Sequence, residues 1–299
     1  MKRRQFLHLG ATALAGAAWA GGTSQKTSPR LPPLRIAFFT DVHAREDMNV
    51  PTRLTAAAKA ISAIQADLVI GTGDTVHGGF TSRPEKMSAR FELARNFIKA
   101  IGRPVVLLPG NHDFVGVRPE DGRLPEPDPL RMFRETFTEE IPPRSWEFQG
   151  YRFFQIQTVQ PVKEKWLYEG RVTDEELSWL EAQLAGTPHD QPLILLSHMP
   201  LQTTHQQVQV APLAPLKPNL VVTNARDVLK LFANHNLRVI LQGHLHVNER
   251  VQWNDQNFLM GGAICGAWWK GPNLGTPPGF GVLKIQGSEI RWEYQPLSI

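Results

Sequence analysis

The amino-acid sequence predicts an α/β domain for two reasons. Short apolar runs alternate with stretches of helical periodicity, and polar clusters follow several of these runs. The chain has 299 residues, of which 41% are hydrophobic and 20% charged, so it has enough apolar side chains for a sizeable core. Its one cysteine, Cys265, excludes an internal disulfide and a cysteine-based zinc ribbon.

Residues 1–20 have the composition of a bacterial export signal. The basic start Lys2-Arg3-Arg4 precedes an apolar stretch of small residues, and Ala18-Trp19-Ala20 fits a cleavage site. Arg3-Arg4-Gln5-Phe6-Leu7 resembles the signal read by the twin-arginine export machinery. The apolar stretch of about 12 residues is shorter than the ~20 that span a bilayer, so we expect no stable membrane anchor. The prediction is a periplasmic or extracellular protein, with residues 21–33 as a flexible lead.

The net charge of the chain depends on this first segment. Lys2, Arg3 and Arg4 supply three of the four net positive charges, and residues 1–20 contain no acid, which leaves the remainder at +1. A nearly neutral domain has little attraction for a polyanion, so we do not expect nucleic acid as a partner.

Residues 34–108 predict three strands separated by two helices. The strands are the short apolar runs 34–39, 68–70 and 105–108. The first helix, 51–66, has proline in its first turn and apolar residues near a helical period, and the second spans 90–101. Strands that alternate with helices indicate a sheet with one face covered by those helices.

The remainder begins with an irregular segment. Residues 115–144 carry six prolines and many charges, which predicts a surface excursion. Thr173-Asp174-Glu175-Glu176 is a capping box that opens a helix to about residue 184, and Asn224 is expected to cap a helix to about residue 234. Further strands are predicted at 151–157, 193–196, 238–242, 280–285 and 289–294, the last two antiparallel. Without a convincing linker, residues 34–299 are predicted to form a single domain.

Five polar clusters each follow a predicted strand. They are Asp41-Val42-His43, Gly73-Asp74, Gly110-Asn111-His112-Asp113, Ser197-His198 and Gly243-His244-Leu245-His246. In open α/β sheets, ligands bind at the carboxyl ends of the strands. We therefore expect the five clusters to converge on one site.

Seven side chains of these clusters are candidate metal ligands: Asp41, His43, Asp74, Asn111, His198, His244 and His246. Residues i and i+2 of a strand point the same way, so Asp41 and His43 can hold one ion together. Asp74 has two oxygens and can bridge two ions. Seven ligands with one bridge give four protein bonds to each of two ions, which leaves positions for water or substrate.

The clusters, in this order, resemble the calcineurin-like metallophosphoesterase superfamily, whose pattern is D-x-H, G-D, G-N-H-D/E, H and G-H-x-H. The resemblance covers residues 34–299 and implies a four-layer α/β/β/α sandwich, in which two mixed sheets carry a dimetal site at the strand ends. It also implies a division of the ligands. The first ion would take Asp41, His43, His246 and Asp74, and the second would take Asn111, His198, His244 and the same Asp74.

The resemblance further implies an activity, the hydrolysis of a phosphomonoester or phosphodiester by a metal-activated hydroxide. His112 would protonate the leaving-group oxygen or stabilise its charge, and Asp113 would fix the orientation of the His112 imidazole. The two ions would be divalent or mixed-valence, and mixed nitrogen and oxygen ligands suit manganese, iron, zinc or cobalt without choosing among them.

Several residues beside the clusters have no assigned role. His77 stands where purple acid phosphatases carry an iron-binding tyrosine, which argues against that branch, and we expect it to be neither a ligand nor a neighbour of one. Arg45 is expected in solvent rather than on a phosphate, and His205 on the surface rather than at the pocket mouth. Trp268 and Trp269 either stack on an aromatic leaving group or sugar, or cover the edge of the second sheet.

Three alternative functions differ from a general phosphoesterase. A catalytically silent scaffold of the same fold would be expected to have lost ligands, and none is missing here. A nuclease would need a basic groove with interleaved aromatic residues, which the remaining charge of +1 does not favour. A cyclic-nucleotide phosphodiesterase would use the same site chemistry, so the sequence does not exclude this function.

Overall fold

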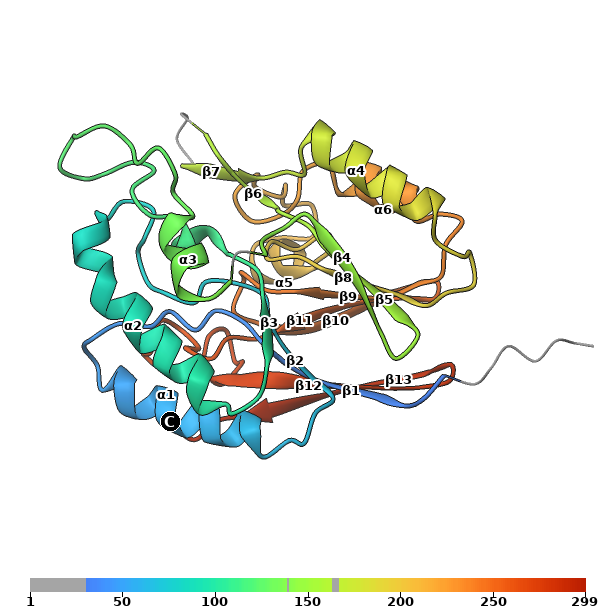
Figure 1. Cartoon of the computed structure of the whole chain (residues 1–299), viewed down its shortest axis with the longest axis horizontal. Helices are drawn as coiled ribbons and strands as arrows, with labels where there is room; N and C mark the ends of the chain where they lie inside the picture. Colours follow the sequence, from blue (N-terminus) through green and yellow to red (C-terminus); the bar gives the residue numbers. More distant parts are fainter. Residues whose placement is uncertain (1–30, 139, 163–166) are drawn as a thin grey trace, which may run out of the picture. The chain divides into compact units, whose positions relative to one another are not determined.

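Two β-sheets packed face to face form the centre of the structure (Figure 1), a computed structural model that describes residues 31–138, 140–162 and 167–299. The expected signal 1–20 and most of the lead 21–33 lie outside the described residues. In the first sheet β1, β2 and β3 run parallel, and β12 and β13 continue it antiparallel. Its order is β13 (Glu289–Pro296), β12 (Gly279–Gln286), β1 (Leu34–Phe39), β2 (Leu68–Gly71), β3 (Val105–Leu107).

The second sheet has a parallel centre and an antiparallel strand at each edge. Its order is β10 (Asn248–Trp253), β11 (Gln256–Gly261), β9 (Leu237–Gln242), β8 (Leu193–Leu196), β5 (Tyr151–Gln155), β4 (Arg144–Phe148). The strands β11, β9, β8 and β5 run parallel, while β10 and β4 run against their neighbours. A separate two-stranded ribbon joins β6 (Val159–Pro161) to β7 (Tyr168–Gly170).

Both faces of each central strand are buried, which explains the uninterrupted apolar runs in the sequence. Successive side chains of a strand point to opposite faces. In β1, Ile36 and Phe38 pack between the two sheets, whereas Ala37 and Phe39 pack beneath the helices. The strands of the second sheet divide their side chains in the same way between the inner layer and the outer helices.

Helices cover the outer face of each sheet, which completes the four-layer α/β/β/α sandwich expected from the sequence. Apolar residues of α1 (Val50–Ser62) and α2 (Pro84–Ala100) pack on the first sheet. Those of α4 (Asp174–Ala185) and α6 (Ala225–Leu231) pack on the second. Three short helices lie in connections: η1 (Asn111–Asp113), α3 (Arg131–Thr136) and α5 (His205–Gln209).

The starts of α4, α6 and α2 test the helix boundaries and caps predicted from the sequence. The predicted cap of α4 is confirmed, because the Thr173 hydroxyl accepts the backbone N–H of Glu176 at 3.2 Å. The Glu176 carboxylate instead accepts the backbone N–H of Gln157 at 2.7 Å. Asn224 is the N-cap residue of α6 as predicted, but its side chain makes no capping bond and instead bonds both backbone groups of Val172, at 3.0 and 2.8 Å. The second helix starts at Pro84, six residues before the expected start.

The segment 115–144, expected as a surface excursion, also contributes to the core. It contains α3, whose Phe133 is fully buried among the residues beneath the first sheet, and Val115 belongs to the same cluster. No helix begins after residue 251 in the described part of the chain.

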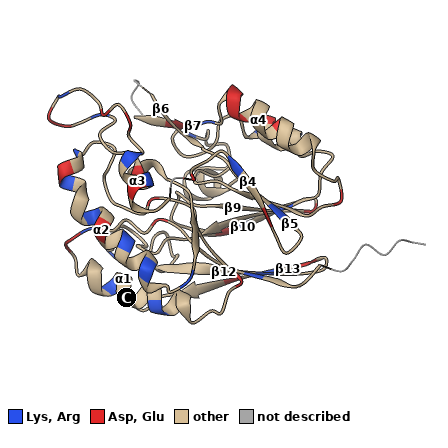
Figure 2. Ribbon diagram, viewed as in Figure 1, with Lys and Arg blue, Asp and Glu red and all other residues tan. Residues whose placement is uncertain are grey.

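Charge is distributed in both signs over the outer elements (Figure 2). Along α2, for example, Glu85 and Glu92 alternate with Lys86 and Arg95. Within the described residues, every helix is too short or too polar to cross a bilayer.

Candidate metal centre

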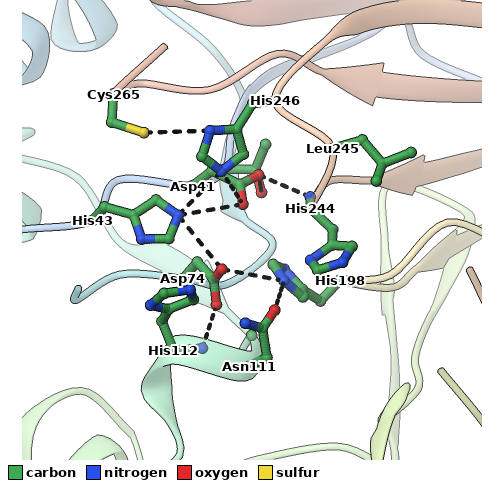
Figure 3. Close-up of polar contacts among 12 residues, drawn as sticks. Asp41, His43, Asp74, Asn111, His112, His198, His244, Leu245, His246 and Cys265 are labelled. Atoms are coloured by element: carbon green, nitrogen blue, oxygen red, sulfur yellow. Dashed lines mark hydrogen bonds and ion pairs between the residues drawn. The ribbon is translucent and has the colours of Figure 1, made fainter. Parts of the chain in front are cut away.

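The five predicted clusters converge at the carboxyl ends of strands from both sheets (Figure 3). The first sheet contributes the residues after β1, β2 and β3, and the second contributes those after β8 and β9. The structure brings all seven expected ligands together: Asp41, His43, Asp74, Asn111, His198, His244 and His246.

Four side chains form a first group of donor atoms. His43 Nε2 lies 3.1 Å from His246 Nε2, 3.5 Å from Asp74 Oδ2 and 3.8 Å from Asp41 Oδ1. His246 Nε2 lies 3.3 Å from the same Asp41 oxygen. Donor atoms bonded at about 2.0–2.2 Å to one transition metal are separated by distances of this size.

A second group shares one atom with the first. His198 Nε2 lies 3.1 Å from Asn111 Oδ1 and 3.5 Å from Asp74 Oδ2, and His244 completes the cluster. Asp74 Oδ2 is therefore 3.5 Å from His43 Nε2 in one group and 3.5 Å from His198 Nε2 in the other. That is the position required of a bridging carboxylate.

Backbone carbonyls orient three of the histidines. The Nδ1 atoms of His198 and His246 lie 2.7 Å from the carbonyl oxygens of Thr72 and Gly266, and His244 Nε2 lies 2.9 Å from that of Asn219. A carbonyl oxygen only accepts, so each of these nitrogens carries the hydrogen. In the neutral ring, the other nitrogen keeps its lone pair for a ligand, as in protein metal sites generally.

The carboxylates meet the electrostatic requirement of a cation site. Burial alone would raise the pKa values of Asp41 and Asp74, but the neighbouring histidines, His246 for Asp41 and His198 for Asp74, hold both below the ordinary range. Both groups are fully buried and stay ionised.

One buried oxygen tests whether ions fit here. Asp41 Oδ2 accepts the Thr40 hydroxyl at 2.7 Å and the backbone N–H of His244 at 2.9 Å. Asp41 Oδ1 is buried without a hydrogen-bond partner among the described residues. Histidine nitrogens lie 3.3 and 3.8 Å from this oxygen, but it accepts no hydrogen bond from them. A buried carboxylate oxygen without a hydrogen bond is costly, and a cation held beside His246 would satisfy it. The donor set therefore fits transition-metal ions.

The backbone reaches this geometry differently from the sequence prediction. Asp41 and His43 do not continue a strand; both have left-handed conformations, with φ of 53° and 46°. Asp74, His244 and His246 share this conformation, with φ of 53°, 76° and 56°. Each such residue costs on the order of 1 kcal/mol or more, a strain typical of functional sites. The expectation that i and i+2 align as in an extended strand is therefore wrong, although the paired residues do meet.

Asp113 does not orient His112 as the sequence suggested. Its carboxylate accepts the backbone N–H groups of Thr75 at 2.9 Å and Gly110 at 2.8 Å, which ties the loop of Asp74 to η1. The His112 ring is held by Gly78, whose backbone N–H donates to Nδ1 at 2.8 Å. The hydrogen of the neutral ring is therefore on Nε2. Burial lowers the pKa of His112 to about 3.

Two aromatic residues lie closer to the centre than expected. The His77 ring stacks on His112 at 5.4 Å between centroids and lies 5.7 Å from the His43 ring. The expectation that His77 does not neighbour a candidate metal ligand is therefore wrong. Trp268 lies 4.4 Å from His43 and 4.7 Å from His246 between ring centroids. The tryptophan pair was the sequence signal for this contact, but it left the placement open.

The structure also places the other residues to which the sequence assigned no role. Trp269 is buried, and its indole N–H donates to the His43 carbonyl at 2.9 Å, so it helps to fix the backbone of the loop that carries His43. Arg45 pairs with Asp47 near the surface. His205 begins α5, where its backbone N–H donates to the Thr203 hydroxyl at 3.0 Å.

Comparisons with known proteins identify the family and the fold. A family model described as calcineurin-like phosphoesterase matches residues 34–248, and one described as the C terminal of calcineurin-like phosphoesterase matches residues 259–298. A probable cyclic nucleotide phosphodiesterase of Synechococcus is 24% identical, over 87% of this chain and 92% of the relative. The 3',5'-cyclic adenosine monophosphate phosphodiesterase of Escherichia coli is 26% identical, over 78% and 76%.

Among solved structures, a dimetal phosphatase from Danio rerio superposes with a TM-score of 0.55 at 15% identity, over 87% of this chain and 98% of that one. At this identity the likeness shows a shared fold.

Proposed function

The chain belongs to the calcineurin-like phosphoesterase family and is a metal-dependent phosphoester hydrolase, and from this premise we propose that it hydrolyses phosphodiesters of the cyclic-nucleotide class. The observation that carries the hydrolytic part of the proposal is the shared oxygen of Asp74, 3.5 Å from a histidine nitrogen in each donor group. The two relatives named as cyclic-nucleotide phosphodiesterases support the substrate class.

We assign the seven side chains to two ions. Asp41, His43, His246 and Asp74 would hold the first, and Asn111, His198, His244 and Asp74 the second. When bound, such a pair supplies Lewis acidity and lowers the pKa of a shared water toward neutrality. Manganese, iron, zinc and cobalt all suit the mixed nitrogen and oxygen donors.

The chain's own residues orient the reaction. The backbone N–H of His112 donates to Asp74 Oδ1 at 2.7 Å, which fixes the bridging carboxylate. The His112 ring, neutral and with its hydrogen on Nε2, can donate a hydrogen bond to the leaving-group oxygen as charge develops there. Of the two roles open for His112, stabilisation of that charge fits the ring better, because Gly78 occupies Nδ1 and a second proton has no place.

The test is hydrolysis by purified, manganese-loaded protein of cyclic AMP, bis-p-nitrophenyl phosphate and p-nitrophenyl phosphate. We expect kcat/KM to be highest for cyclic AMP and lowest for the monoester. Asp74→Asn should lose both ions and at least about 10³-fold in activity, since it removes the shared ligand. A protein that binds two ions but hydrolyses none of the three would be the silent scaffold, and a preference for the monoester would overturn the diester assignment.

We further propose that residues 1–20 form a twin-arginine-type signal peptide that is cleaved, and that residues 34–299 act as a single domain outside the cytoplasmic membrane. Replacing Arg3 and Arg4 by lysine should retain the protein in the cytoplasm, measured by cell fractionation and N-terminal sequencing. Unchanged export of this variant, or a periplasmic protein that still begins at residue 1, would contradict the proposal.

A further inference from the structure

We infer that Trp268 is a stacking platform that selects phosphoesters whose alcohol carries a planar aromatic group, such as a nucleobase. This inference rests on the proposed function and names the residue that sets its substrate preference. The Trp268 side chain is 40% exposed, whereas its partners His43 and His246 are buried. One part of the indole thus contacts the metal centre while another remains open to a ligand.

The position of Trp268 relates it to the leaving group. Its ring centroid lies 5.4 Å from that of His112, the residue assigned to the leaving-group oxygen, and 5.6 Å from that of His77. His77 itself stacks on His112 at 5.4 Å with 24° between the planes. An ester group that extends from an oxygen beside His112 therefore has two aromatic rings within reach. These rings offer π-faces, which favour a planar group over an aliphatic one.

The loop that carries Trp268 is held in place. Trp268 and Trp269 both have left-handed backbones, with φ of 56° and 68°, which is unusual for bulky residues. The backbone N–H of Trp269 donates to the Cys265 carbonyl at 2.8 Å, and that of Ala267 donates to the Gly271 carbonyl at 2.8 Å. Because the platform is already ordered, the protein loses little conformational entropy when a ligand stacks there.

A packing role alone would give a different result. If Trp268 only covered the histidines, its removal would disturb the metal centre and lower the rate of hydrolysis of every substrate equally. A stacking role predicts a loss confined to aromatic substrates, because a non-aromatic diester makes no use of the indole face. Base stacking on aromatic side chains contributes about 1–3 kcal/mol, which corresponds to roughly 5- to 150-fold in affinity.

The experiment compares cyclic AMP with glycerophosphoethanolamine, a diester without an aromatic group, in manganese-loaded wild type, Trp268→Leu and Trp268→Phe. The matched control is Trp253→Leu, which removes a 69% exposed tryptophan from β10. We expect Trp268→Leu to raise the KM for cyclic AMP about ten-fold. The KM for glycerophosphoethanolamine should change less than two-fold. Trp268→Phe should recover part of the loss, and Trp253→Leu should match wild type.

Binding provides a readout that does not depend on turnover. AMP should bind wild type about ten-fold more tightly than glycerol 3-phosphate in calorimetric titration, and Trp268→Leu should abolish this difference. Equal losses on both substrates, or loss of metal from Trp268→Leu, would overturn the stacking role. Wild type inactive on both diesters would instead refute the proposed function, whereas a tryptophan-dependent preference for AMP would still support the platform.

Discussion

At the scale of single residues, hydrogen bonds to the backbone set the chemistry of the histidines. His198, His244 and His246 each place one ring nitrogen against a carbonyl, so in the neutral ring the opposite nitrogen is left without hydrogen. His112 is bound the other way, because Gly78 donates to its Nδ1 and leaves the hydrogen on Nε2. The same side-chain type thus offers a ring lone pair in these three places and a ring N–H in the fourth.

This difference predicts separate effects of mutation. His112→Ala should keep both ions and lower kcat by about 10²- to 10³-fold, because it removes only the group that faces the leaving-group oxygen. Metal analysis beside steady-state kinetics on a phosphodiester measures both quantities. The matched control is His189→Ala, an exposed histidine that packs on His235. Wild-type turnover by His112→Ala, or loss of its ions, would remove His112 from this role.

The sequence was sufficient for the seven candidate ligands and insufficient for their surroundings. Metal coordination demands particular residue types at the ends of strands, so five such clusters in order indicate candidates such as Asp41 and His246. The place of Trp268 depends on left-handed backbone in a loop, which has no periodic signature. Asp113 shows the same limit, because its carboxylate bonds Thr75 and Gly110 through tertiary folding rather than its neighbour His112.

At the scale of elements, burial explains most successes and failures of the sequence prediction, although the buried strand β11 was also missed. Strands β1 and β8 were predicted with the bounds that the structure has, because both of their faces are apolar. The edge strands β4 and β10 were missed, because one alternates partly buried polar and apolar residues and the other is largely exposed. Helix α3 was missed because its segment is rich in proline and charge, although Phe133 anchors it in the core.

The start of α4 gives a prediction about pH. Burial raises the pKa of Glu176 from 4.5 to about 7, so the ionised form is disfavoured in the folded protein. This group therefore favours folding most below pH 4.5, and its own contribution to the free energy of unfolding falls as the pH rises from there to about 7. Glu176→Gln keeps an acceptor for Gln157 and should remove this fall, stabilising the protein at pH 8 by on the order of 2 kcal/mol relative to wild type.

Urea unfolding at pH 4 and pH 8 measures the effect, with the exposed neighbour Glu175→Gln as control. The control should keep the pH dependence of wild type. If Glu176→Gln retains the same fall between the two pH values, burial does not raise the pKa of Glu176 as stated.

At the scale of the whole domain, the metal centre is assembled from two sheets. Asp41, His43, Asp74 and Asn111 follow strands of the first sheet, and His198, His244 and His246 follow strands of the second. The donor atoms meet only when the two sheets pack correctly through the inner apolar layer. Ion binding should therefore be linked to folding of the entire domain.

Manganese should accordingly raise the melting temperature. A ligand at 100 times its Kd adds about 2.7 kcal/mol, which corresponds to an increase of roughly 5–10 °C for a domain of this size. Thermal unfolding with increasing Mn²⁺, and after chelation, measures the effect. Asp74→Asn, which lacks the shared ligand, should show a much smaller increase. An equal increase in that variant would mean that manganese binds elsewhere.

The division of the ligands between two sheets has a mechanical consequence. Any sliding of one sheet over the other changes the spacing between two halves of a coordination sphere, and ions tolerate little variation in bond length. Leu196 and Leu241 lie in the inner layer rather than at the site, and we expect them to act as spacers between those halves. Evolution could adjust metal preference in such an enzyme by resizing these leucines, without touching a single ligand.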